Sequence, residues 1–375
     1  MKVLITGADG FIGKNLLAHL GERSDVEVVR FTRADDVTRL PALIADVDFV
    51  FHLAGVNRPQ NPQEFQSGNA DLTRSLCDAI TAGGRPVPVL YTSSSQAEQD
   101  NPYGSSKRGA EQALLELAET SGAAVHLFRL SNVFGKWARP NYNSAVATFC
   151  HNIARELPIQ INDPDARINL VYIDDVISHF LAVMDGRLAG DPFARVAPQY
   201  SITVGELAEQ LRTFRDSRQS LITEPVGSGL ARALYSTYLS YLPPECFTYE
   251  VPKYADARGM FVEMLKTKDS GQFSFFTAHP GITRGGHYHH SKTEKFLVIR
   301  GKACFRFRHI VSGEFHELFT TGEQPEIVET VPGWTHDITN AGDDEMLVML
   351  WANEIFDREH PDTFARPVGT IDPAQ

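Results

Sequence analysis

The chain has 375 residues, and its 47 acidic against 35 basic side chains give a net charge of −12. A balance this acidic excludes a general electrostatic attraction to nucleic acid or to an anionic membrane surface, so we expect neither among its partners. The length suggests two or three domains with enough apolar surface to bury a core.

The cysteines and the apolar runs indicate the cellular compartment of the protein. Four cysteines lie far apart in the sequence and form no close pair, which favours a reducing compartment over a disulfide framework. The N-terminus has no basic flank with an extended apolar region, and no apolar run approaches the length of about 18 residues that a membrane helix needs. We therefore expect a cytoplasmic protein.

Up to about residue 185, short apolar runs alternate with amphipathic helical patterns. This alternation predicts a parallel sheet with helices on both faces, the Rossmann-type doubly wound α/β fold. The runs expected to form buried strands are residues 3–5, 26–31, 49–53, 87–91 and 125–130.

From about residue 247 the predicted strands are closely spaced and separated by Gly, Pro, Asn and Asp, which indicates an all-β barrel or sandwich. Pro243 and Pro244 lie between the two patterns and cannot continue a helix. We therefore predict one domain over residues 1–243 and a second over 247–375. The expected strands of the second are residues 273–277, 295–299, 303–307, 327–330 and 346–351.

The segment "ITGADGFIGKNLL" places three glycines, Gly7, Gly10 and Gly13, between the first strand and a helix. A tight turn followed by a helix N-terminus holds a pyrophosphate on backbone amides, so we predict a dinucleotide site. A purely structural role in helix–strand packing is the alternative. The predicted cofactor contacts are Gly7, Gly10, Phe11, Ile12, Gly13, Arg33, Leu53, Ala54 and Lys107.

The end of the second strand indicates which dinucleotide binds. In "VVRFTRADD", Arg30 and Arg33 precede Asp35 and Asp36, where a ribose-binding acid is usually found. An arginine at this place can pair with a 2′-phosphate, so we expect NADPH rather than NADH, although a merely solvated arginine would give the same pattern.

"YGSSK" places Tyr103 and Lys107 one helical turn apart on the same face. A lysine ammonium beside a phenol lowers the pKa of that phenol, which makes Tyr103 a workable acid for a developing alkoxide. The pair alone could be a solvated helix face, but it follows a strand and a serine cluster in a chain with a dinucleotide turn. We therefore predict that it is catalytic.

These motifs resemble the extended short-chain dehydrogenase/reductase family, in which "ITGADGFIG", "FHLAG", the serine run, "YGSSK", "RLSNVFG" and "NLVYIDDV" occur in this order. The resemblance implies that Ser94 polarises a substrate carbonyl, that Tyr103 donates the proton and that Lys107 lowers the pKa of Tyr103. Ser95 is a rival to Ser94, because fewer residues separate Ser94 from Tyr103 than the family usually has.

Further polar residues are candidates for substrate binding. By the resemblance, Asn132 in "SNVFG" would lie near the nicotinamide or the sugar, with a turn-forming Asn as the alternative. Arg58, Asn143 and Arg167 could meet a diphosphate or sugar hydroxyls, and a structural role is equally open for each.

The second domain carries a potential metal site. His287 and His289 are two residues apart, so on a strand they point to one face, and Glu294 and His336 can join them. Three imidazoles and one carboxylate suit a divalent ion such as zinc, with an open position for water or substrate. We therefore predict a metal held by these four side chains.

The spacing of Gly281, His287, His289, Glu294 and Gly301 resembles the first cupin motif, and "PGWTHDITN" resembles the second. "RGGHYHH" and "EKFLVIRG" also resemble cupin-fold epimerases of 4-keto sugars. That similarity implies His287 as a metal-free base and matches Lys295 to the lysine of those enzymes, but offers no tyrosine acid in "EMLVMLWANE". We favour the ligand role for His287, because a metal-free site leaves His289, Glu294 and His336 unexplained.

The two domains together resemble fused enzymes that make sugar nucleotides for capsule and O-antigen. This resemblance implies C3 epimerisation of a UDP-2-acetamido-2,6-dideoxy-4-hexulose in the cupin, followed by NADPH-dependent reduction at C4, toward UDP-N-acetyl-L-fucosamine. One alternative is a reductase whose cupin is only a metal-stabilised dimerisation module. A second alternative, a ligand sensor without turnover, is disfavoured by Tyr103 and Lys107. We expect a homo-oligomer, specifically a dimer through the cupin.

Overall fold

The computed structural model describes residues 1–188, 192–251, 253–256, 259–262, 265–267, 271–354 and 359–369. By its internal contacts the chain divides into two compact units. The first unit comprises Met1–Ser144 and Arg167–Ile202, and the second comprises Ala145–Ala166 and Thr203–Gln375. The domain boundary at residues 243–247 stays a prediction, because these units group segments by contact alone.

The first unit is built on a six-stranded parallel sheet with the strand order β2-β1-β3-β4-β5-β8. The order reverses direction between β1 and β3, which creates the crevice where such sheets bind ligands. The strands are β1 Lys2–Thr6, β2 Glu27–Phe31, β3 Phe49–His52, β4 Val89–Ser94, β5 Val125–Leu130 and β8 Phe193–Ala194.

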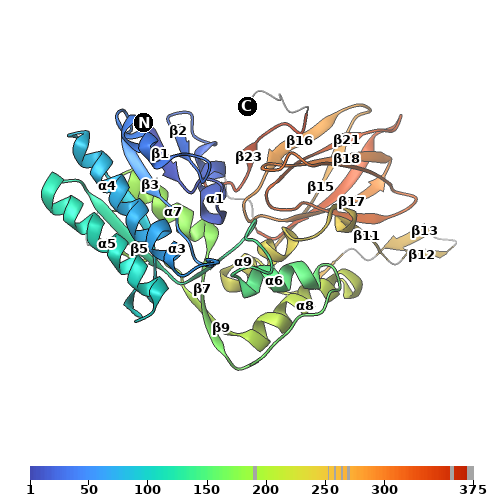
Figure 1. The fold of residues 1–375 in the computed structure, drawn as a ribbon. Coiled ribbons are helices and arrows are strands. Elements are labelled where there is room, and N and C mark those ends of the chain that lie inside the picture. The colour runs from blue at the N-terminus through green and yellow to red at the C-terminus, as the bar shows by residue number, and fades with distance from the viewer. Residues whose placement is uncertain are drawn as a thin grey trace. The chain divides into compact units, whose positions relative to one another are not determined.

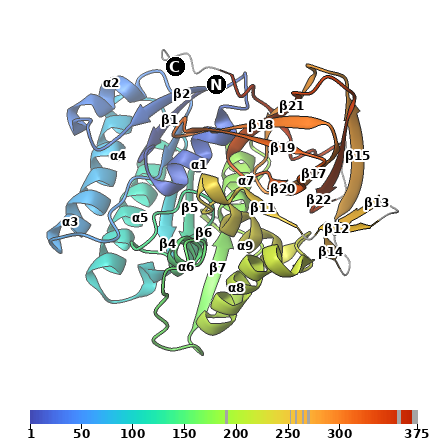
Figure 2. The same cartoon turned by 90° about the vertical axis from the view of Figure 1, so that its right-hand side faces the viewer.

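Helices cover both faces of this sheet, as the alternating pattern predicts (Figure 1). Helices α2, α4 and α5 pack together on one face, and α1 and α7 pack together on the other (Figure 2). The α-helices are α1 Phe11–Leu20, α2 Leu40–Ile44, α3 Gln63–Phe65, α4 Leu72–Ala82, α5 Pro102–Ser121 and α7 Ile173–Met184. Three short helices join them, η1 Val37–Arg39, the π-helical η2 Gln66–Asp71 and η3 Ser95–Glu98.

The core of the first unit lies between the sheet and its helices. Leu4, Val50, Leu114 and Leu127 are fully buried there, so the apolar runs of the sequence form both sides of the interface. A smaller sheet of β6 Asn132–Phe134, β7 Arg167–Tyr172 and β9 Tyr200–Thr203 extends beyond the main one.

The second unit contains a group of three mutually packed helices, α6 Ala145–Ile153, α8 Val204–Ser220 and α9 Gly229–Leu239. Helix α8 begins at a capping box, in which Thr203 and Glu206 satisfy each other's backbone amides. The 3-10 helix η4 Pro244–Cys246 follows this group.

The rest of the second unit is a barrel of two five-stranded antiparallel sheets, with the orders β11-β20-β17-β22-β15 and β19-β18-β21-β16-β23 (Figure 1). This arrangement confirms the all-β barrel expected from the sequence. Its strands are β11 Thr248–Glu250, β15 Gln272–Ala278, β16 Thr283–Tyr288, β17 Glu294–Arg300, β18 Lys302–His309, β19 Phe315–Thr321, β20 Glu326–Glu329, β21 Trp334–Asn340, β22 Met346–Ala352 and β23 Phe364–Ala365. Short strand pairs accompany the barrel, formed by β10 Ile222–Thr223 with β14 Lys266–Thr267 and by β12 Lys253–Asp256 with β13 Gly259–Val262.

The predicted strands are confirmed with small shifts. The run predicted over residues 87–91 starts at Val89 instead, since Pro88 has no N–H to donate to a neighbouring strand. Among the described residues, no helix combines the length and the apolar character needed to cross a bilayer.

Candidate functional site

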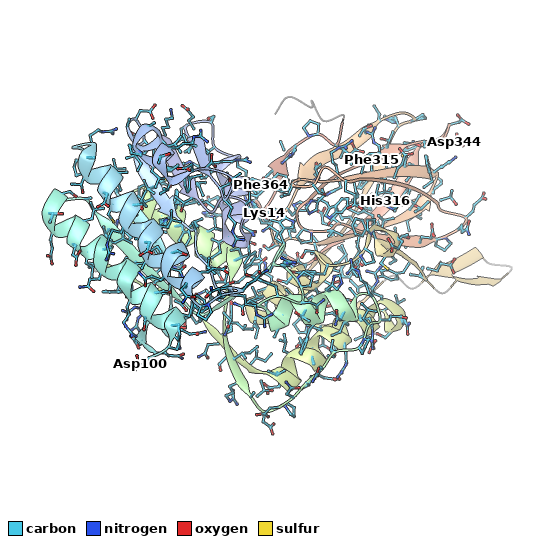
Figure 3. The ribbon with its side chains drawn as sticks, viewed as in Figure 1. Lys14, Asp100, Phe315, His316, Asp344 and Phe364 are labelled. Atoms are coloured by element: carbon cyan, nitrogen blue, oxygen red, sulfur yellow. The ribbon has the colours of Figure 1, made fainter. Side chains whose placement is uncertain are left out.

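A cavity of about 840 Å³ opens in the first unit where strands β1, β3 and β4 end. It lies at the reversal of strand order, and Lys14 on α1, labelled in Figure 3, is part of its wall. Most of the residues predicted for the reductase site line it, namely Gly7, Gly10, Phe11, Ile12, Gly13, Arg33, Leu53, Ser94, Ser95, Tyr103, Lys107, Asn132 and Asn143.

The glycine turn brings backbone very close to backbone. Gly7 has φ of +69°, and a Cβ atom added there would lie 2.7 Å from the Cα and N atoms of Ala54. A Cβ on Gly13 would lie 2.4 Å from the Gly7 carbonyl oxygen. Gly10 is the N-cap of α1, so the first amides of that helix are left for a ligand. The turn therefore fits a dinucleotide pyrophosphate, with Ala54 packed against Gly7 rather than lining the cavity.

Asp35 and Asp36, the carboxylates near the predicted ribose position, accept hydrogen bonds from neighbouring residues. The Asp35 carboxylate accepts hydrogen bonds from the amide and hydroxyl of Thr32, and Asp36 accepts one from the Thr38 amide. These bonds hold the pKa of both carboxyls below its usual value. Arg33 lines the cavity, whereas Arg30 is not among its lining residues. Arg33 therefore places a positive charge on the cavity wall, which is the charge that a 2′-phosphate requires.

Helix α5 fixes the Tyr–Lys pair. The side chain of Asn101 accepts a hydrogen bond from the Gly104 amide at 2.8 Å and so caps the helix, whose first residue is Pro102. Lys107 lies one turn after Tyr103, and its Nζ donates to the Thr92 carbonyl at 2.9 Å. Burial lowers the pKa of Lys107 to about 8. The buried ammonium is therefore close to titration at neutral pH.

Ser94 and Ser95 differ in their surroundings. Ser94 is the last residue of β4 and is buried, whereas Ser95 is exposed. Burial raises the pKa of Tyr103, and a hydrogen bond with the Ser94 side chain opposes that rise. This contact favours Ser94 over Ser95 as the partner of Tyr103, and the catalytic role of Ser94 stays a prediction.

The predicted substrate residues are only partly brought together. Asn132 lines the cavity and donates from Nδ2 to the Asn169 carbonyl at 3.0 Å. Neither Arg58 nor Arg167 is among the lining residues, and Arg167 is exposed at the start of β7. Their substrate role stays a prediction that the cavity does not support.

Some of the lining residues carried no motif in the sequence. Arg139 and Tyr142 are among them, and they lie in the loop between β6 and α6. The guanidinium carbon of Arg139 lies 5.4 Å from the Tyr142 ring centroid, and that of Arg58 lies 6.0 Å from it. Arg58 therefore reaches the wall through Tyr142, in a contact that no local sequence pattern encodes.

The four predicted metal ligands meet inside the barrel of the second unit. One candidate ligand atom from each of His287, His289, Glu294 and His336 lies within 4.8 Å of all the others. His287 ends the bulged part of β16, Glu294 starts β17, and His336 lies on β21. His289 follows β16 directly, yet its ring still faces the group, with its centroid 5.1 Å from that of His287.

The group has donor atoms without protein partners. Neither ring nitrogen of His336 has a hydrogen-bond partner in the part of the chain that the structure describes, and its Nε2 lies 3.6 Å from Glu294 Oε2. Burial alone would raise the pKa of Glu294, but the neighbouring imidazoles hold it well below its usual value. An ionised carboxylate beside buried, unpaired imidazole nitrogens is the donor set that a divalent cation requires. The residues present fit the predicted metal.

A small cavity, lined in part by apolar side chains, lies beside the candidate metal ligands. A cavity of about 170 Å³ is lined by His287, Glu294 and His336, together with Phe276, Phe296, Phe305, Phe307, Arg284, Thr330 and Asp337 among others. Burial and the neighbouring imidazoles lower the pKa of His287 to about 3, so its ring is neutral and able to donate a lone pair. Asp337 is bound to Arg306 by two hydrogen bonds of 2.8 and 2.9 Å.

Lys295 does not join this group. It is the neighbour of Glu294 on β17, so its side chain points to the opposite face of the strand. There it contacts the Glu329 carboxylate and donates to the Tyr249 hydroxyl at 2.8 Å. Lys295 therefore lies apart from the four candidate ligands, and the likeness to the epimerase lysine gives it no place among them.

Two family models match the chain. The NAD dependent epimerase/dehydratase family matches residues 3–194, and the polysaccharide biosynthesis C-terminal domain matches residues 254–364. A UDP-2-acetamido-2,6-beta-L-arabino-hexul-4-ose reductase of Pseudomonas aeruginosa is 67% identical over 369 residues, which cover 98% of this chain and 99% of the relative. The chain belongs to the NAD dependent epimerase/dehydratase family.

Within this family the chain is CapF-like. The crystal structure of the capsular polysaccharide assembling protein CapF from Staphylococcus aureus is 41% identical, with a TM-score of 0.68, and the match covers 98% of this chain and all 100% of CapF. A crystal structure of CapF with the inhibitor 3-isopropenyl-tropolone is 37% identical, with a TM-score of 0.63 and coverage of 98% and 100%. These matches confirm the resemblance to fused sugar-nucleotide enzymes of capsule biosynthesis.

Proposed function

We propose that this CapF-like enzyme reduces the C4 ketone of a UDP-2-acetamido-2,6-dideoxy-4-hexulose with NADPH, after epimerising C3 of that sugar in the barrel, toward UDP-N-acetyl-L-fucosamine for capsule or O-antigen. One observation carries the reduction: Tyr103, Lys107 and Ser94 line the same cavity as the glycine turn. The name of the 67% identical relative, a hexul-4-ose reductase, supports the substrate class.

The residues of the first unit have separable roles in this reduction. The glycine turn and Arg33 would hold NADPH, which would supply the hydride when bound. Tyr103 donates a proton to the oxygen of the former ketone, and Ser94 orients that oxygen by a hydrogen bond. The Lys107 ammonium stabilises the phenolate left on Tyr103.

The barrel contributes the step before the reduction. Removing a proton next to a ketone becomes easy only if the enolate is stabilised. His287, His289, Glu294 and His336 would hold a divalent metal such as zinc, which supplies Lewis-acid polarisation of a carbonyl oxygen. The unpaired nitrogens of His336 and the adjoining 170 Å³ cavity support this role.

The two steps are tested in one experiment. The protein is incubated with a UDP-4-keto-hexosamine in deuterated buffer, with and without NADPH, and the sugar is followed by mass spectrometry. We expect deuterium at the carbon beside the ketone without NADPH, and reduced product only with it. No exchange with a competent substrate would contradict the epimerase step alone.

Two variants separate the sites. Tyr103→Phe should lower NADPH oxidation by about 10²–10⁴-fold, the usual loss for a general acid, while deuterium exchange continues. His336→Ala should lower exchange by about 10²-fold, because several kcal/mol of charge stabilisation are lost with the metal. If exchange survives both His336→Ala and metal removal, the alternative holds, in which the barrel only supports a dimer.

We further propose a homodimer through the barrel. Strand β15 is the last strand of its sheet, and residues Phe273 and Phe275 on it are 46% and 71% exposed. An exposed edge strand with large apolar side chains is a surface that a second copy can cover. Light scattering should show a dimer for the wild type and a monomer for Phe275→Glu.

The cytoplasmic location stays a prediction.

A further inference from the structure

The loop that joins two of the candidate metal ligands is held almost entirely by side chains. Residues 289–293 connect β16 to β17 and separate His289 from Glu294. Every residue of this loop is buried. A buried loop must satisfy its amides within the protein, because no water reaches them.

All five consecutive amides from residue 290 to residue 294 donate to side-chain oxygens. Three of them, from His290, Ser291 and Lys292, donate to the carboxylate of Asp362 at 2.8, 2.7 and 2.6 Å. The next two donate to Asn353 Oδ1 at 3.0 Å and to Thr330 Oγ1 at 2.9 Å. Asp362 is thus the principal acceptor for the loop.

The backbone of Asp362 contacts a ligand directly. Its carbonyl oxygen accepts a hydrogen bond from His289 Nδ1. With Nδ1 used as the donor, Nε2 is the nitrogen that remains for the group, and it lies 3.1 Å from Glu294 Oε2. A carbonyl at this place fixes both the tautomer and the rotation of the ring.

The segment around Asp362 is anchored to the strands that carry the ligands. Thr363 accepts a hydrogen bond from Lys292 Nζ at 3.0 Å, and β23 pairs with β16. The ring of Phe364, labelled in Figure 3, lies 4.9 Å from that of His290 and 5.6 Å from that of Tyr288. Asp362 is therefore held in place independently of any metal.

We propose that Asp362 is a positioning residue of the barrel site, which arranges the 289–293 loop so that His289 and Glu294 face one cation before that cation binds. This inference rests on the proposed metal site. Asp362 has no role in contacting the metal or the sugar; it acts through the loop amides and through the His289 ring.

The first test compares Asp362→Asn with Asp344→Asn. Asp344 is exposed in the turn between β21 and β22 and is labelled in Figure 3, so the same substitution there leaves the loop untouched. Asn presents an NH2 group where Asp362 now accepts amide hydrogens. We expect metal-free Asp362→Asn to bind Co²⁺ about 10–100-fold more weakly than wild type, with an altered visible Co²⁺ spectrum, and Asp344→Asn to match wild type.

The outcomes separate the inference from the proposed function. If wild type binds neither Zn²⁺ nor Co²⁺, the proposed metal site is wrong and the inference goes with it. If wild type binds Co²⁺ and Asp362→Asn shows the same affinity and spectrum, the inference alone is overturned. A merely structural role would lower the melting temperature of the metal-free protein and leave the Co²⁺ spectrum of the folded fraction unchanged.

The second test needs no variant. Hydrogen exchange of the 290–294 amides is followed by mass spectrometry in the metal-free wild-type protein and again with Zn²⁺. We expect slow exchange before any metal is added, because Asp362, Asn353 and Thr330 already hold these amides. Fast exchange that slows only with Zn²⁺ would overturn the proposal, whatever the stability of Asp362→Asn.

Discussion

Among the buried lysines, Lys107 of the first unit and Lys295 of the second have pKa values displaced in opposite directions. Lys107 and Lys295 have 5% and 2% of their surface exposed. Burial lowers the pKa of Lys107 to about 8. Burial acts in the same direction on Lys295, but the Glu329 carboxylate outweighs it and raises the pKa of Lys295 above its usual value.

The difference shows that the partner, rather than burial, decides what a buried cation can do. Lys107 donates to a carbonyl and lines an open cavity, so its charge remains available to the reaction. Lys295 lies against the carboxylate of Glu329, which Arg218 also contacts. Glu329 neutralises the charge of Lys295 in place, so we expect Lys295 to act on the stability of the barrel rather than on a reaction. The matched substitutions of both lysines by methionine test this contrast.

The largest expected effect is a loss of stability in Lys295→Met. It leaves the Glu329 carboxylate, 1% exposed, without one of its two cations, so the free energy of unfolding should fall by about 3 kcal/mol. Chemical denaturation followed by tryptophan fluorescence measures it. The control is Lys302→Met, on the exposed part of β18, with an expected change within about 0.5 kcal/mol. If both variants lose the same free energy of unfolding, Lys295 contributes no more to stability than an exposed lysine does.

Lys107→Met should act on the reaction instead. Without the ammonium, the phenolate of Tyr103 loses the positive charge that we propose stabilises it, and kcat/KM for NADPH oxidation should fall by about 10²-fold. Steady-state kinetics with the 4-keto sugar measures this, with Lys302→Met again as the control. A wild-type rate would remove Lys107 from the mechanism.

The pH dependence of the reduction should follow the same lysine. Because the pKa of Lys107 is lowered to about 8, the ammonium loses its proton as the pH rises through that value. The kcat/KM of the reduction, which reports groups of the free enzyme, should then fall by about tenfold per pH unit above 8. Lys295 contributes nothing here, since its pKa is raised. A flat profile up to pH ~10 would contradict the lowered pKa.

The smallest expected effect is a gain in stability in Lys107→Met. The folded-state pKa of Lys107, about 8, lies below the ordinary value of 10.5, so between these values the unfolded chain binds more protons. The charged lysine therefore destabilises the folded state below pH ~8, and stability returns as the pH rises toward 10.5. At pH 7 the variant should be about 1–2 kcal/mol more stable than wild type, after the loss of the Thr92 hydrogen bond is subtracted from the gain of roughly 3 kcal/mol that the pKa shift implies. This gain should vanish near pH 10.5.

The reductase site could be predicted closely because its motifs are local. Gly7, Gly10 and Gly13 occupy one strand–turn–helix segment, and Tyr103 and Lys107 occupy one helical turn, so their spacing already contains their geometry. Arg139 and Tyr142 carried no such pattern. They belong to a loop, and only the folded chain brings them to the cavity wall.

In the barrel, too, the sequence predicted only those site residues that belong to a local pattern. The spacing of His287 and His289 predicted a shared face, and their candidate ligand atoms lie together with one from Glu294 and one from His336. The likeness of Lys295 to an epimerase lysine conflicted with the alternation of side chains along a strand, because neighbours such as Glu294 and Lys295 face opposite sides. Asp362, far along the chain, had no local signal at all, since its bonds form only in the folded barrel.

The second compact unit includes helices from before the two prolines, and this determines where the gene can be cut. Helices α8 and α9 precede the prolines at 243 and 244, yet they belong to the compact unit of the barrel. Arg218 on α8 contacts Glu329, Arg232 on α9 lies 2.9 Å from Glu354, and Ser236 donates to the Ser291 carbonyl at 2.7 Å. A gene cut between the prolines would therefore give two polypeptides with complementary, unsatisfied charges. Such halves should accumulate as a co-purifying pair, while either one made alone should be degraded in the cell.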